Sequence, residues 1–491
     1  MTGSDSLAAA FGEASQSTVT GSESWGCPGV SALDPAPPNA AECPSAQPVD
    51  PVDGAQFRFR RTANLLTLRA RYQDANGGAD NRLEFKVFGS DGRVVASKLE
   101  TGVRSGDVTW RLPPGVLHQG ELYSWTVRGY DPTRELYSHP AEPSRFRGVV
   151  VGASMHPLWA DGDDFERGLD LLRDSGATAV RIDLIWGKLE DRGAASFSDR
   201  IGGDPHNGYA ATADRFFEAA RRRGLGVIVD LWGTPCWAST APGRDCADAN
   251  WWETQPLVGR SPPSNPGAYA GAAAKVVRRW GASIEALEVW NEPNSESFLA
   301  AGPCQAVDDC PGADAYARLL KAGYSGVKRA SPRTRVLGGV IAGADARYLE
   351  WLYAPGRSIR GFHDGISAHP YDFERPGLPG TADLLEVMEE HGEADRGLWI
   401  TELGQSTCTD AEDGSRCTHS EDDQATYLGE ALDSETGPRS DERIRALVIY
   451  NLRDKAFDST FDSNFGIVKR SFEPKPAYSR VRDLLFGVSA R

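Results

Sequence analysis

From about residue 148 onward, short apolar runs alternate with longer stretches in which apolar residues recur every three or four positions. The short runs are typical of buried strands, and the longer stretches are typical of amphipathic helices that cover them. Strands are expected at Val149–Ala153, Ala179–Leu184, Gly226–Leu231, Ala286–Trp290, Arg335–Val340, Gly365–Ala368, Leu398–Thr401 and Ala446–Tyr450. Helices are expected between them, for example at Asp164–Ser175, Ala210–Arg223, Pro266–Trp280, Ala313–Ala330 and Gln424–Ser434.

Eight strand–helix units in one segment predict an α/β fold, a single (β/α)8 TIM barrel over residues 148–491. The competing architecture is a doubly wound open sheet, which usually has fewer strands. That sheet often carries a glycine-rich dinucleotide-binding turn after its first strand, and no such turn follows Val149–Ala153. The pattern therefore favours the barrel.

Residues 47–147 show a different pattern, in which short alternating strands are separated by Gly- and Asp-containing turns. This spacing predicts a small antiparallel β-sandwich of the immunoglobulin or fibronectin III-like type, with an accessory role. Residues 1–46 are rich in Ser, Ala, Gly and Pro and lack periodicity, so we expect a flexible tail with one disulfide-closed loop. The sandwich strands are expected at Leu65–Tyr72, Leu83–Phe88, Val108–Leu112 and Leu122–Arg128.

Composition narrows the class of protein. The 491 residues are 40% hydrophobic and 9% aromatic, which is typical of a folded globular chain with a large core. The net charge of −16 disfavours nucleic acid as a partner, because phosphate backbones bind basic surfaces. No apolar run approaches the roughly 20 residues that a membrane-spanning helix needs. The oligomeric state leaves no mark on the sequence.

The eight cysteines fall into four close pairs, which favours four local disulfides among the 105 possible connectivities. The expected bridges are Cys27–Cys43, Cys236–Cys246, Cys304–Cys310 and Cys408–Cys417. The alternative is metal binding, but neither CxxC spacing nor a histidine at zinc-finger distance occurs. Four disulfides indicate an oxidising compartment, so we expect a secreted, bacterial extracellular protein. Since no charged segment followed by an apolar one is present, its leader is expected to have been removed.

Two of the predicted barrel strands end in a glutamate. The run Leu287–Val289 leads through Trp290 to Asn291-Glu292-Pro293, and Leu398–Thr401 leads directly to Glu402. In a (β/α)8 barrel the carboxyl ends of the strands form the active site, and these two strands would be the fourth and seventh. Hydrolysis of an acetal needs two carboxyl groups, one to protonate the leaving oxygen and one to meet the cationic carbon.

Other strand ends are polar or aromatic as well, which strengthens the prediction of a site. Each has a simpler interpretation: Arg181 as the partner in a buried ion pair, the histidines as satisfied core groups, and the tryptophans as packing residues or as flat platforms for sugar rings. Glu288 is expected to be structural. The candidate residues at these ends are His156, Arg181, Trp232, Trp237, His369, Tyr371 and Tyr450, together with Trp186, Trp251 and Trp252 as further possible platforms.

The barrel segment resembles the clan A retaining glycoside hydrolases. The resemblance rests on Asn291-Glu292-Pro293 after the fourth strand, Glu402 after the seventh, and His369-Pro370-Tyr371 after the sixth. The second-strand arginine and the late segments Phe465–Val468 and Pro474–Tyr478 add to it. Within the clan, Thr234–Ser239 looks most like family 39, with family 5 the nearest alternative. The resemblance covers residues 148–491 and not the N-terminal third.

The resemblance implies a role for each residue. Glu292 would be the general acid/base, and Glu402 would be the nucleophile, kept ionised by hydrogen bonds from Arg181 and Tyr371. Carboxyl groups that act in this way lie about 5–5.5 Å apart. Asn291 would bind the sugar 2-hydroxyl. His369 would bond near the acid/base or support Tyr371, and His156 would line the same subsite.

One departure concerns the eighth strand, where the clan often has tryptophan and this chain has Tyr450. Tyr450 would supply a smaller platform, which leaves the sugar open among a β-xyloside, a β-glucan, an arabinan-type furanoside and a bacterial exopolysaccharide. The expected activity is double-displacement cleavage of a poly- or oligosaccharide, with no cofactor and no metal. Two alternatives remain: a catalytically silent carbohydrate-binding protein of the cell surface, and a transglycosylase that uses the same two glutamates.

Overall fold

The computed structural model describes residues 44–487, apart from 51–54, 58–65, 75–79, 90–91, 114–115, 118–121, 134–135, 139–140, 142, 159–163, 191–192, 195–207, 249, 373–376, 410–418, 434–440 and 442. Internal contacts divide the chain into two units, Met1–Val149 and Val150–Arg491. The expected bridge Cys27–Cys43 and the expected tail, up to residue 43, lie outside the described residues.

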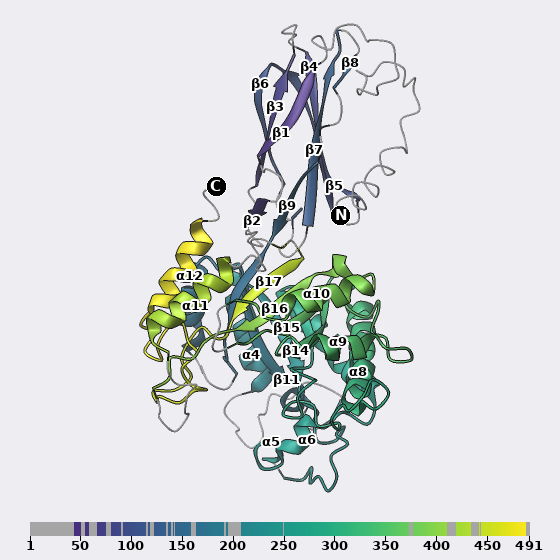
Figure 1. Cartoon of the computed structure of the whole chain (residues 1–491), viewed down its shortest axis with the longest axis vertical. Coiled ribbons are helices and arrows are strands. Elements are labelled where there is room, and N and C mark those ends of the chain that lie inside the picture. Colours follow the sequence, from purple (N-terminus) through teal and green to yellow (C-terminus); the bar gives the residue numbers. More distant parts are fainter. Residues whose placement is uncertain are drawn as a thin grey trace. The chain divides into compact units, whose positions relative to one another are not determined.

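The first unit consists of two sheets, as predicted (Figure 1). Side chains alternate between buried and exposed along β3 and β4, and the buried ones from both sheets form one core that includes Tyr72, Phe85 and Trp125. A shared core between two sheets is what defines a sandwich. The three-stranded sheet has the order β1 (Ser45–Asp50), β3 (Thr67–Gln73) and β6 (Gly106–Arg111). The other has the order β2 (Ala55–Phe57), β9 (Ser144–Gly148), β7 (Leu122–Asp131), β4 (Asn81–Gly89) and β5 (Val94–Val103), with β8 (Leu136–Tyr137) paired to β7.

The second unit is a closed barrel of eight parallel strands in sequence order, which confirms the predicted (β/α)8 fold (Figure 1). All residues of five of the strands are buried, since helices cover the outside and side chains fill the inside. The strands are β10 (Val150–Ser154), β11 (Ala179–Ile185), β12 (Gly226–Trp232), β13 (Ile284–Val289), β14 (Arg335–Ala342), β15 (Gly365–His369), β16 (Leu398–Leu403) and β17 (Ile444–Ile449).

The helices of the second unit follow the predicted amphipathic stretches closely. Pro266 and Pro311 occupy the first turns of α7 and α8, where proline costs no hydrogen bond, and the Asn265 side chain caps α7 by accepting from Gly267 N. The longer helices are α2 (Phe165–Asp174), α4 (Tyr209–Arg222), α7 (Pro266–Trp280), α8 (Pro311–Ala330), α9 (Ala346–Tyr353), α10 (Thr381–Glu390), α11 (Glu421–Asp433) and α12 (Pro476–Gly487). Short helices are α3 (Trp186–Leu189), α5 (Trp251–Thr254), α6 (Pro256–Arg260) and the 3-10 turn η4 (Ala394–Arg396).

The barrel interior changes from apolar to charged toward the carboxyl ends of the strands. One buried cluster contains Ala179, Ile228 and Ala286, contributed by three neighbouring strands. Two residues further along two of these strands, the register pairs Asp230 with Glu288. Charged residues are rarely fully buried unless they are paired, so this layer needs cations that compensate it.

Two disulfides are described as expected, Cys236–Cys246 and Cys304–Cys310. Cys408 is also disulfide-bonded, and its expected partner Cys417 lies outside the described residues. Within the described ranges, no helix is long and apolar enough to cross a membrane.

Candidate active site

The backbone after β13 takes an unusual path that carries Glu292. Trp290 and Glu292 have φ values of 71° and 39°, in the left-handed region that residues with a Cβ rarely adopt. The backbone N–H of Ser295 donates to the carbonyl of Glu292 at 2.9 Å, which closes a tight turn. Residues in such conformations cost about 1–3 kcal/mol each and cluster at functional sites. The strand therefore ends in a strained turn at the residue that the sequence singled out.

Glu292, Glu402 and His369 lie together, although they come from the ends of β13, β16 and β15. One oxygen or ring nitrogen from each residue lies within 4.8 Å of the others. The side chains of Glu292 and Glu402 keep 18% and 12% of their surface exposed, so neither is fully enclosed in the barrel. The fold thus brings together the two glutamates that the sequence predicted.

Glu402 is held at both oxygens. Arg181 Nη1 donates to Glu402 Oε1 at 2.6 Å, and the Tyr371 hydroxyl donates to Glu402 Oε2 at 2.8 Å. Burial raises the pKa of Tyr371 well above its ordinary value, and the nearby charge of Glu402 raises it further, so the phenol remains a donor at any ordinary pH. Both carboxylate oxygens of Glu402 therefore accept a hydrogen bond from a fixed donor.

Arg181 is the charged centre of the site and is only 1% exposed. Its Nε donates to Glu288 Oε2 at 2.6 Å, and its Nη2 donates to Asp230 Oδ2 at 3.3 Å and to Asn291 Oδ1 at 3.1 Å. Burial lowers its pKa, but the charges of Glu288, Glu402 and Asp230 outweigh burial and raise the pKa of Arg181 well above its ordinary value. The guanidinium therefore fixes Asn291 and Glu402 relative to each other.

His369 connects the two glutamates. Its Nδ1 lies 2.8 Å from Glu292 Oε1 and 3.9 Å from Glu402 Oε2, and its side chain is fully buried. Burial lowers the pKa of His369, but the charge of Glu402 and the hydrogen bond with Glu292 prevail, so the pKa lies above its ordinary value. His369 was expected either to bond near Glu292 or to support Tyr371, and its hydrogen bond is with Glu292.

A second polar group lies next to this cluster. His156 Nδ1 is 3.2 Å from Asp183 Oδ2, and the Trp232 indole N–H donates to Asp183 Oδ1 at 3.3 Å. Burial raises the pKa of Asp183, but the hydrogen bond and charge of His156 outweigh it and hold the pKa well below its ordinary range. Trp232 is partly exposed and packs edge-on against Phe298 at 5.4 Å.

Tyr450 follows β17 and packs against aromatic rings of the site. Its ring lies edge-on 5.7 Å from the ring of His156 and 6.5 Å from that of Tyr371, and its hydroxyl accepts a hydrogen bond from Lys455 Nζ. Gly404, just after β16, lies so close to the Tyr450 carbonyl that a Cβ there would collide with it. This close approach of β16 and β17 keeps Tyr450 near Glu402, whose charge contributes to its raised pKa, after burial.

Trp237 is placed differently from the other candidates. Its indole N–H donates to the Glu190 carbonyl at 2.7 Å, and its ring packs edge-on 6.1 Å from Trp186. In the described part of the chain it makes no hydrogen bond to Glu292 or Glu402. Trp251 and Trp252 also pack edge-on against each other at 5.6 Å. These rings belong to the packing beneath the loop that follows β12.

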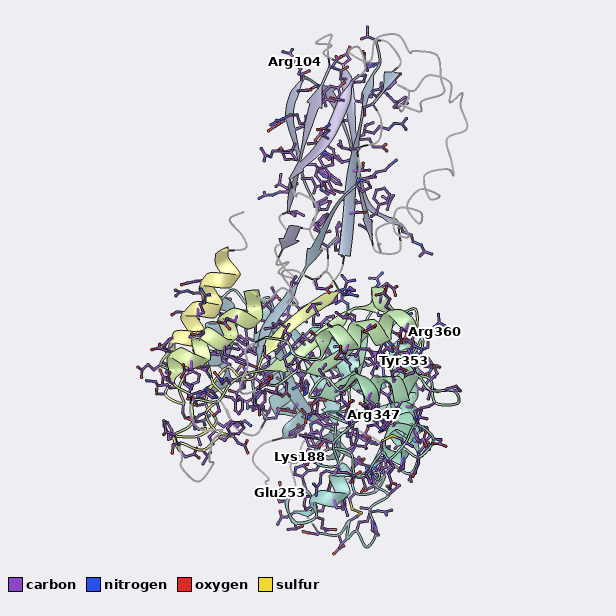
Figure 2. The ribbon with its side chains drawn as sticks, viewed as in Figure 1. Arg104, Lys188, Glu253, Arg347, Tyr353 and Arg360 are labelled. Carbon is purple, nitrogen blue, oxygen red and sulfur yellow. A yellow bond between two sulfur atoms is a disulfide. The ribbon has the colours of Figure 1, made fainter. Side chains whose placement is uncertain are left out.

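An ion pair lies beside the Trp252 ring. Lys188 Nζ lies 5.7 Å from the centre of the Trp252 ring and 3.5 Å from Glu253 Oε1 (Figure 2). The cation therefore stands over an indole face at the edge of the loop that follows β12.

Three residues that contact this network were not among the candidate site residues: Asp183, Asp230 and Lys455. Glu288, which was expected to be structural, is a direct partner of Arg181. The signal was available for the three acids, because each is a charged residue inside a mostly apolar strand. Lys455 lies in a loop, where no periodicity could identify it.

Glu292, His369 and Glu402 offer three ligand atoms at a spacing that could hold a metal ion. The positive guanidinium of Arg181 is bonded directly to one of the three, Glu402, and a neighbouring cation opposes the binding of another. The charge of Arg181 therefore disfavours a metal ion at this group.

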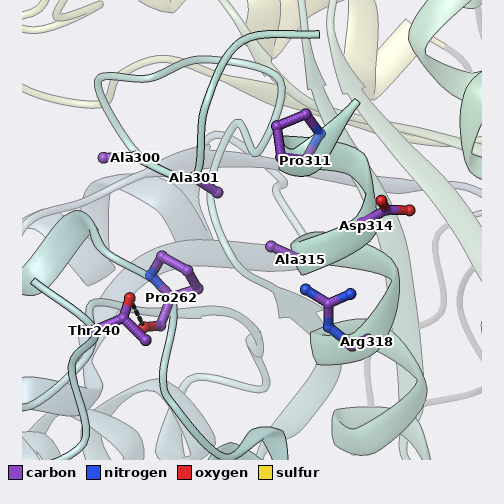
Figure 3. A pocket seen from close by; sticks show the side chains of 8 residues that line it. All are labelled: Thr240, Pro262, Ala300, Ala301, Pro311, Asp314, Ala315 and Arg318. Atoms are coloured by element: carbon purple, nitrogen blue, oxygen red, sulfur yellow. Dashed lines mark hydrogen bonds between the residues drawn. The ribbon is translucent and has the colours of Figure 1, made fainter. Parts of the chain in front are cut away.

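A separate hollow of about 320 Å³ lies between the loops after β12 and β13 and the start of α8 (Figure 3). It contains neither of the two glutamates. Asp314 in its lining accepts a hydrogen bond from Arg357 at 2.7 Å, and Thr240 donates to the Pro262 carbonyl at 2.8 Å. The lining residues are Thr240, Pro262, Ala300, Ala301, Pro311, Asp314, Ala315 and Arg318.

No protein-family model matches this sequence, and no curated protein sequence matches it significantly. Among solved structures, the chain is similar to a family 39 glycoside hydrolase from the gut symbiont Bacteroides cellulosilyticus WH2, with a TM-score of 0.49 and 18% identity over 90% of this chain and 82% of that chain. A family 39 β-xylosidase from Caulobacter crescentus gives a TM-score of 0.47 and 19% identity over 68% of this chain and 70% of that chain.

A calcium-binding mutant of β-glucuronidase 2 from Bacteroides uniformis gives a TM-score of 0.45 and 13% identity over 86% of this chain and 48% of that chain. The chain thus spans about half the length of that protein. At these scores and identities, neither activity nor substrate is transferred from these proteins to this chain.

Proposed function

We propose that the protein is a secreted retaining glycoside hydrolase that cleaves O-glycosidic bonds of a poly- or oligosaccharide. The observation that carries the proposal is the convergence of Glu292 and Glu402, with ligand atoms within 4.8 Å of each other and of His369. Carboxyl groups this close leave no space for the water that an inverting enzyme places between sugar and base, and retaining enzymes use such a spacing.

Glu402 is proposed as the nucleophile. Two hydrogen bonds, from Arg181 and Tyr371, fix its direction. It would attack the anomeric carbon, and the bond from that carbon to the leaving oxygen would break as the glycosyl ester forms. Asn291, oriented by Arg181, would hydrogen-bond the sugar beside the reacting carbon, where charge develops in the transition state.

Glu292 is proposed as the general acid and base. Oε1 is bonded to His369, which leaves Oε2 to carry the proton for the leaving oxygen. After the leaving group departs, the same carboxylate would take a proton from water, and the hydroxide equivalent would release the sugar from Glu402 with its original anomeric configuration. Tyr450, Trp232 and His156 would surround the sugar, and Trp237 would support the loop after β12.

The disulfides Cys236–Cys246 and Cys304–Cys310, together with bonded Cys408, support an oxidising, extracellular location. They lie in loops after β12 and β13 and next to β16, which are the loops that would border the substrate. Loops that are already rigid lose less entropy when they bind a ligand.

The test uses an aryl glycoside that the wild-type protein hydrolyses, identified from a panel of sugars, with azide as an external nucleophile. Glu292→Ala should form the glycosyl enzyme from a substrate with a good leaving group, and azide should release a glycosyl azide of retained configuration. Glu402→Ala should lose turnover and give the inverted azide. Glu296→Gln is the matched control: this exposed glutamate of the same loop bonds only the Gly302 N–H within the described residues, and its turnover should match the wild type.

The alternatives give different results. A catalytically silent binding protein would turn over no sugar of the panel before any substitution. A transglycosylase would give the same azide products but would transfer the sugar to an added acceptor in preference to water. The proposal is contradicted if Glu292→Ala yields the inverted azide, or if Glu402→Ala hydrolyses the substrate as the wild type does.

A further inference from the structure

Three carboxyl groups share one buried cation at the centre of the barrel. Arg181 bonds Glu288, Asp230 and Glu402, and the side chains of Arg181, Asp230 and Glu288 are 1%, 0% and 0% exposed. If all three acids were ionised, two negative charges would remain uncompensated in the barrel interior. Burial of an unpaired charge is so costly that such groups take up a proton instead.

The positions of Asp230 and Glu288 show where that proton belongs. They are register partners on the adjacent strands β12 and β13, so their side chains lie side by side inside the barrel. Each uses one oxygen for Arg181, and the other oxygen of each, Asp230 Oδ1 and Glu288 Oε1, is buried without a hydrogen-bond partner in the described part of the chain. When one carboxyl group of such a pair takes up a proton, its oxygen becomes a donor, and the ionised neighbour remains an acceptor.

We propose that Asp230 is a positioning residue that holds a proton shared with Glu288, so that Arg181 compensates two carboxylates, Glu288 and Glu402, instead of three. Glu288 then faces Arg181 Nε as a carboxylate, and Asp230 stays neutral. The cluster of Arg181, Asp230, Glu288 and Glu402 then carries a single net negative charge. This inference rests on the proposed function, because it assigns the pair the task of keeping the proposed nucleophile ionised.

The remaining charged groups around Asp230 agree with a protonated form. Asp183, on β11, is a register partner of Asp230 on its other side and is ionised through its bond with His156. Burial raises the pKa of Asp230, Arg181 lowers it, and the charges of Glu288, Asp183 and Glu402 raise it further, to well above its ordinary value. Burial, and then the charge of Asp230, raise the pKa of Tyr269. Its hydroxyl donates to the Leu231 carbonyl at 2.7 Å.

Infrared difference spectroscopy tests the proton directly and needs no substrate. A protonated carboxylic acid has a carbonyl stretch that an ionised carboxylate lacks. Glu292, the proposed acid, would contribute its own band, so the comparison is made in a Glu292→Gln background. Adding Asp230→Asn should abolish the remaining band at neutral pH. Adding Glu288→Gln instead should abolish it as well, because Asp230 then faces Arg181 and a neutral amide and ionises.

The proposal is overturned if the remaining band survives in both double variants. It is also overturned if Glu292→Gln alone shows no such band. The two variants also protect the test against a folding failure in one of them. Because the spectra do not depend on turnover, a band that behaves as expected in a protein that cleaves no glycoside would refute the proposed function and leave the shared proton intact.

The pH profile of kcat/KM tests the consequence for Glu402. Removal of a real negative charge near a nucleophile moves the acid limb to lower pH, whereas replacement of a neutral acid by a neutral amide does not. Asp230→Asn should therefore leave the position of the acid limb unchanged, whatever the change in kcat. Glu288→Gln should leave it nearly unchanged as well, because the newly ionised Asp230 replaces the lost charge. A movement of the acid limb to lower pH in Asp230→Asn would mean that Asp230 is ionised in the wild type.

Discussion

His369 Nδ1 lies 2.8 Å from Glu292 Oε1, although the two residues are 77 positions apart in the sequence. The same nitrogen is 3.9 Å from Glu402 Oε2, so one imidazole spans both acidic side chains. Its full burial means that this contact, rather than solvent, sets its protonation. The strand ends of the barrel thus bring a histidine and two carboxyl groups into one coupled unit.

The first prediction concerns the pH dependence of stability. The pKa of His369 is raised in the folded protein, since the charge of Glu402 and the bond with Glu292 outweigh burial. A group with a raised folded pKa stabilises the fold below its unfolded pKa, and this stabilisation is lost as pH rises through the folded pKa. The gap in unfolding free energy between wild type and His369→Gln should therefore be larger at about pH 6 than at about pH 9. Urea unfolding at both pH values measures it, and a gap that widens with pH would contradict the assignment.

Arg181 should be the most costly single side chain to remove from the barrel. Arg181→Met leaves Glu288 and Asp230 without their cation, and loss of one partner from a buried ion pair costs about 3–5 kcal/mol. Thermal and urea unfolding measure the change. The control is Arg221→Met, because the pair of Arg221 with Glu218 lies on the exposed surface of α4 and should contribute little. Equal stability of the two variants would mean that Arg181 does not compensate the buried acids.

Glu393 should give the protein an acid-sensitive element away from the site. Its carboxylate bonds His363 Nε2, the Tyr353 hydroxyl and the Gly361 N–H, each at 2.9 Å, and Tyr353 ends α9 (Figure 2). Burial raises the pKa of Glu393, but the bond and charge of His363 prevail and lower it from 4.5 to about 2.

A depressed folded pKa stabilises the fold above the unfolded pKa, and the stabilisation is lost as pH falls through the folded value. Glu393→Gln should therefore be less stable than the wild type at about pH 6, with a gap that closes as the pH falls from 4.5 toward 2. Denaturant unfolding across this range tests the prediction. A gap that is constant with pH would show that the ionisation of Glu393 adds nothing to stability.

The disulfide Cys236–Cys246 should stabilise the fold by a modest amount. It closes a loop with a sequence separation of 10, for which the chain-entropy account gives about 2–3 kcal/mol. The double variant Cys236→Ser/Cys246→Ser should unfold at correspondingly lower urea concentration under oxidising conditions. Under reducing conditions the variant and the wild type should converge, and a difference that persists there would have to come from packing of the serine side chains.

The sequence predicted the barrel because each of its strands is buried at nearly every residue and reads as a short, mostly apolar run. It did not predict β5, since this strand (Val94–Val103) has mostly exposed or partly exposed side chains and gives no clear alternation. The boundaries moved for local reasons: β13 ends at Val289 because Trp290 enters the left-handed turn. The sequence pattern therefore identifies a strand that has one or two apolar faces. It does not identify a strand that has none.

The candidate site could be predicted where a charged residue stands out at or near the end of an apolar strand, as at Glu292, Glu402 and Arg181. A contact that depends on the register of two strands was harder to predict. The pairing of Asp230 with Glu288 follows from the alignment of β12 and β13, which no local pattern specifies. Trp237 was expected to contact sugar; its indole N–H donates to the Glu190 carbonyl, and the expected contact stays a prediction. Aromatic residues at a barrel rim look alike in sequence, because packing and sugar binding use the same side chains.

The most direct test of the central claim is to trap the proposed covalent intermediate. An activated 2-deoxy-2-fluoro glycoside of a sugar that the protein cleaves slows release of the glycosyl enzyme, so the adduct accumulates and its site can be read by peptide mass spectrometry. The account predicts one sugar per chain, attached to the peptide that contains Glu402, and no adduct in Glu402→Gln. Attachment at another residue, or time-dependent turnover with inversion and no adduct, would contradict it.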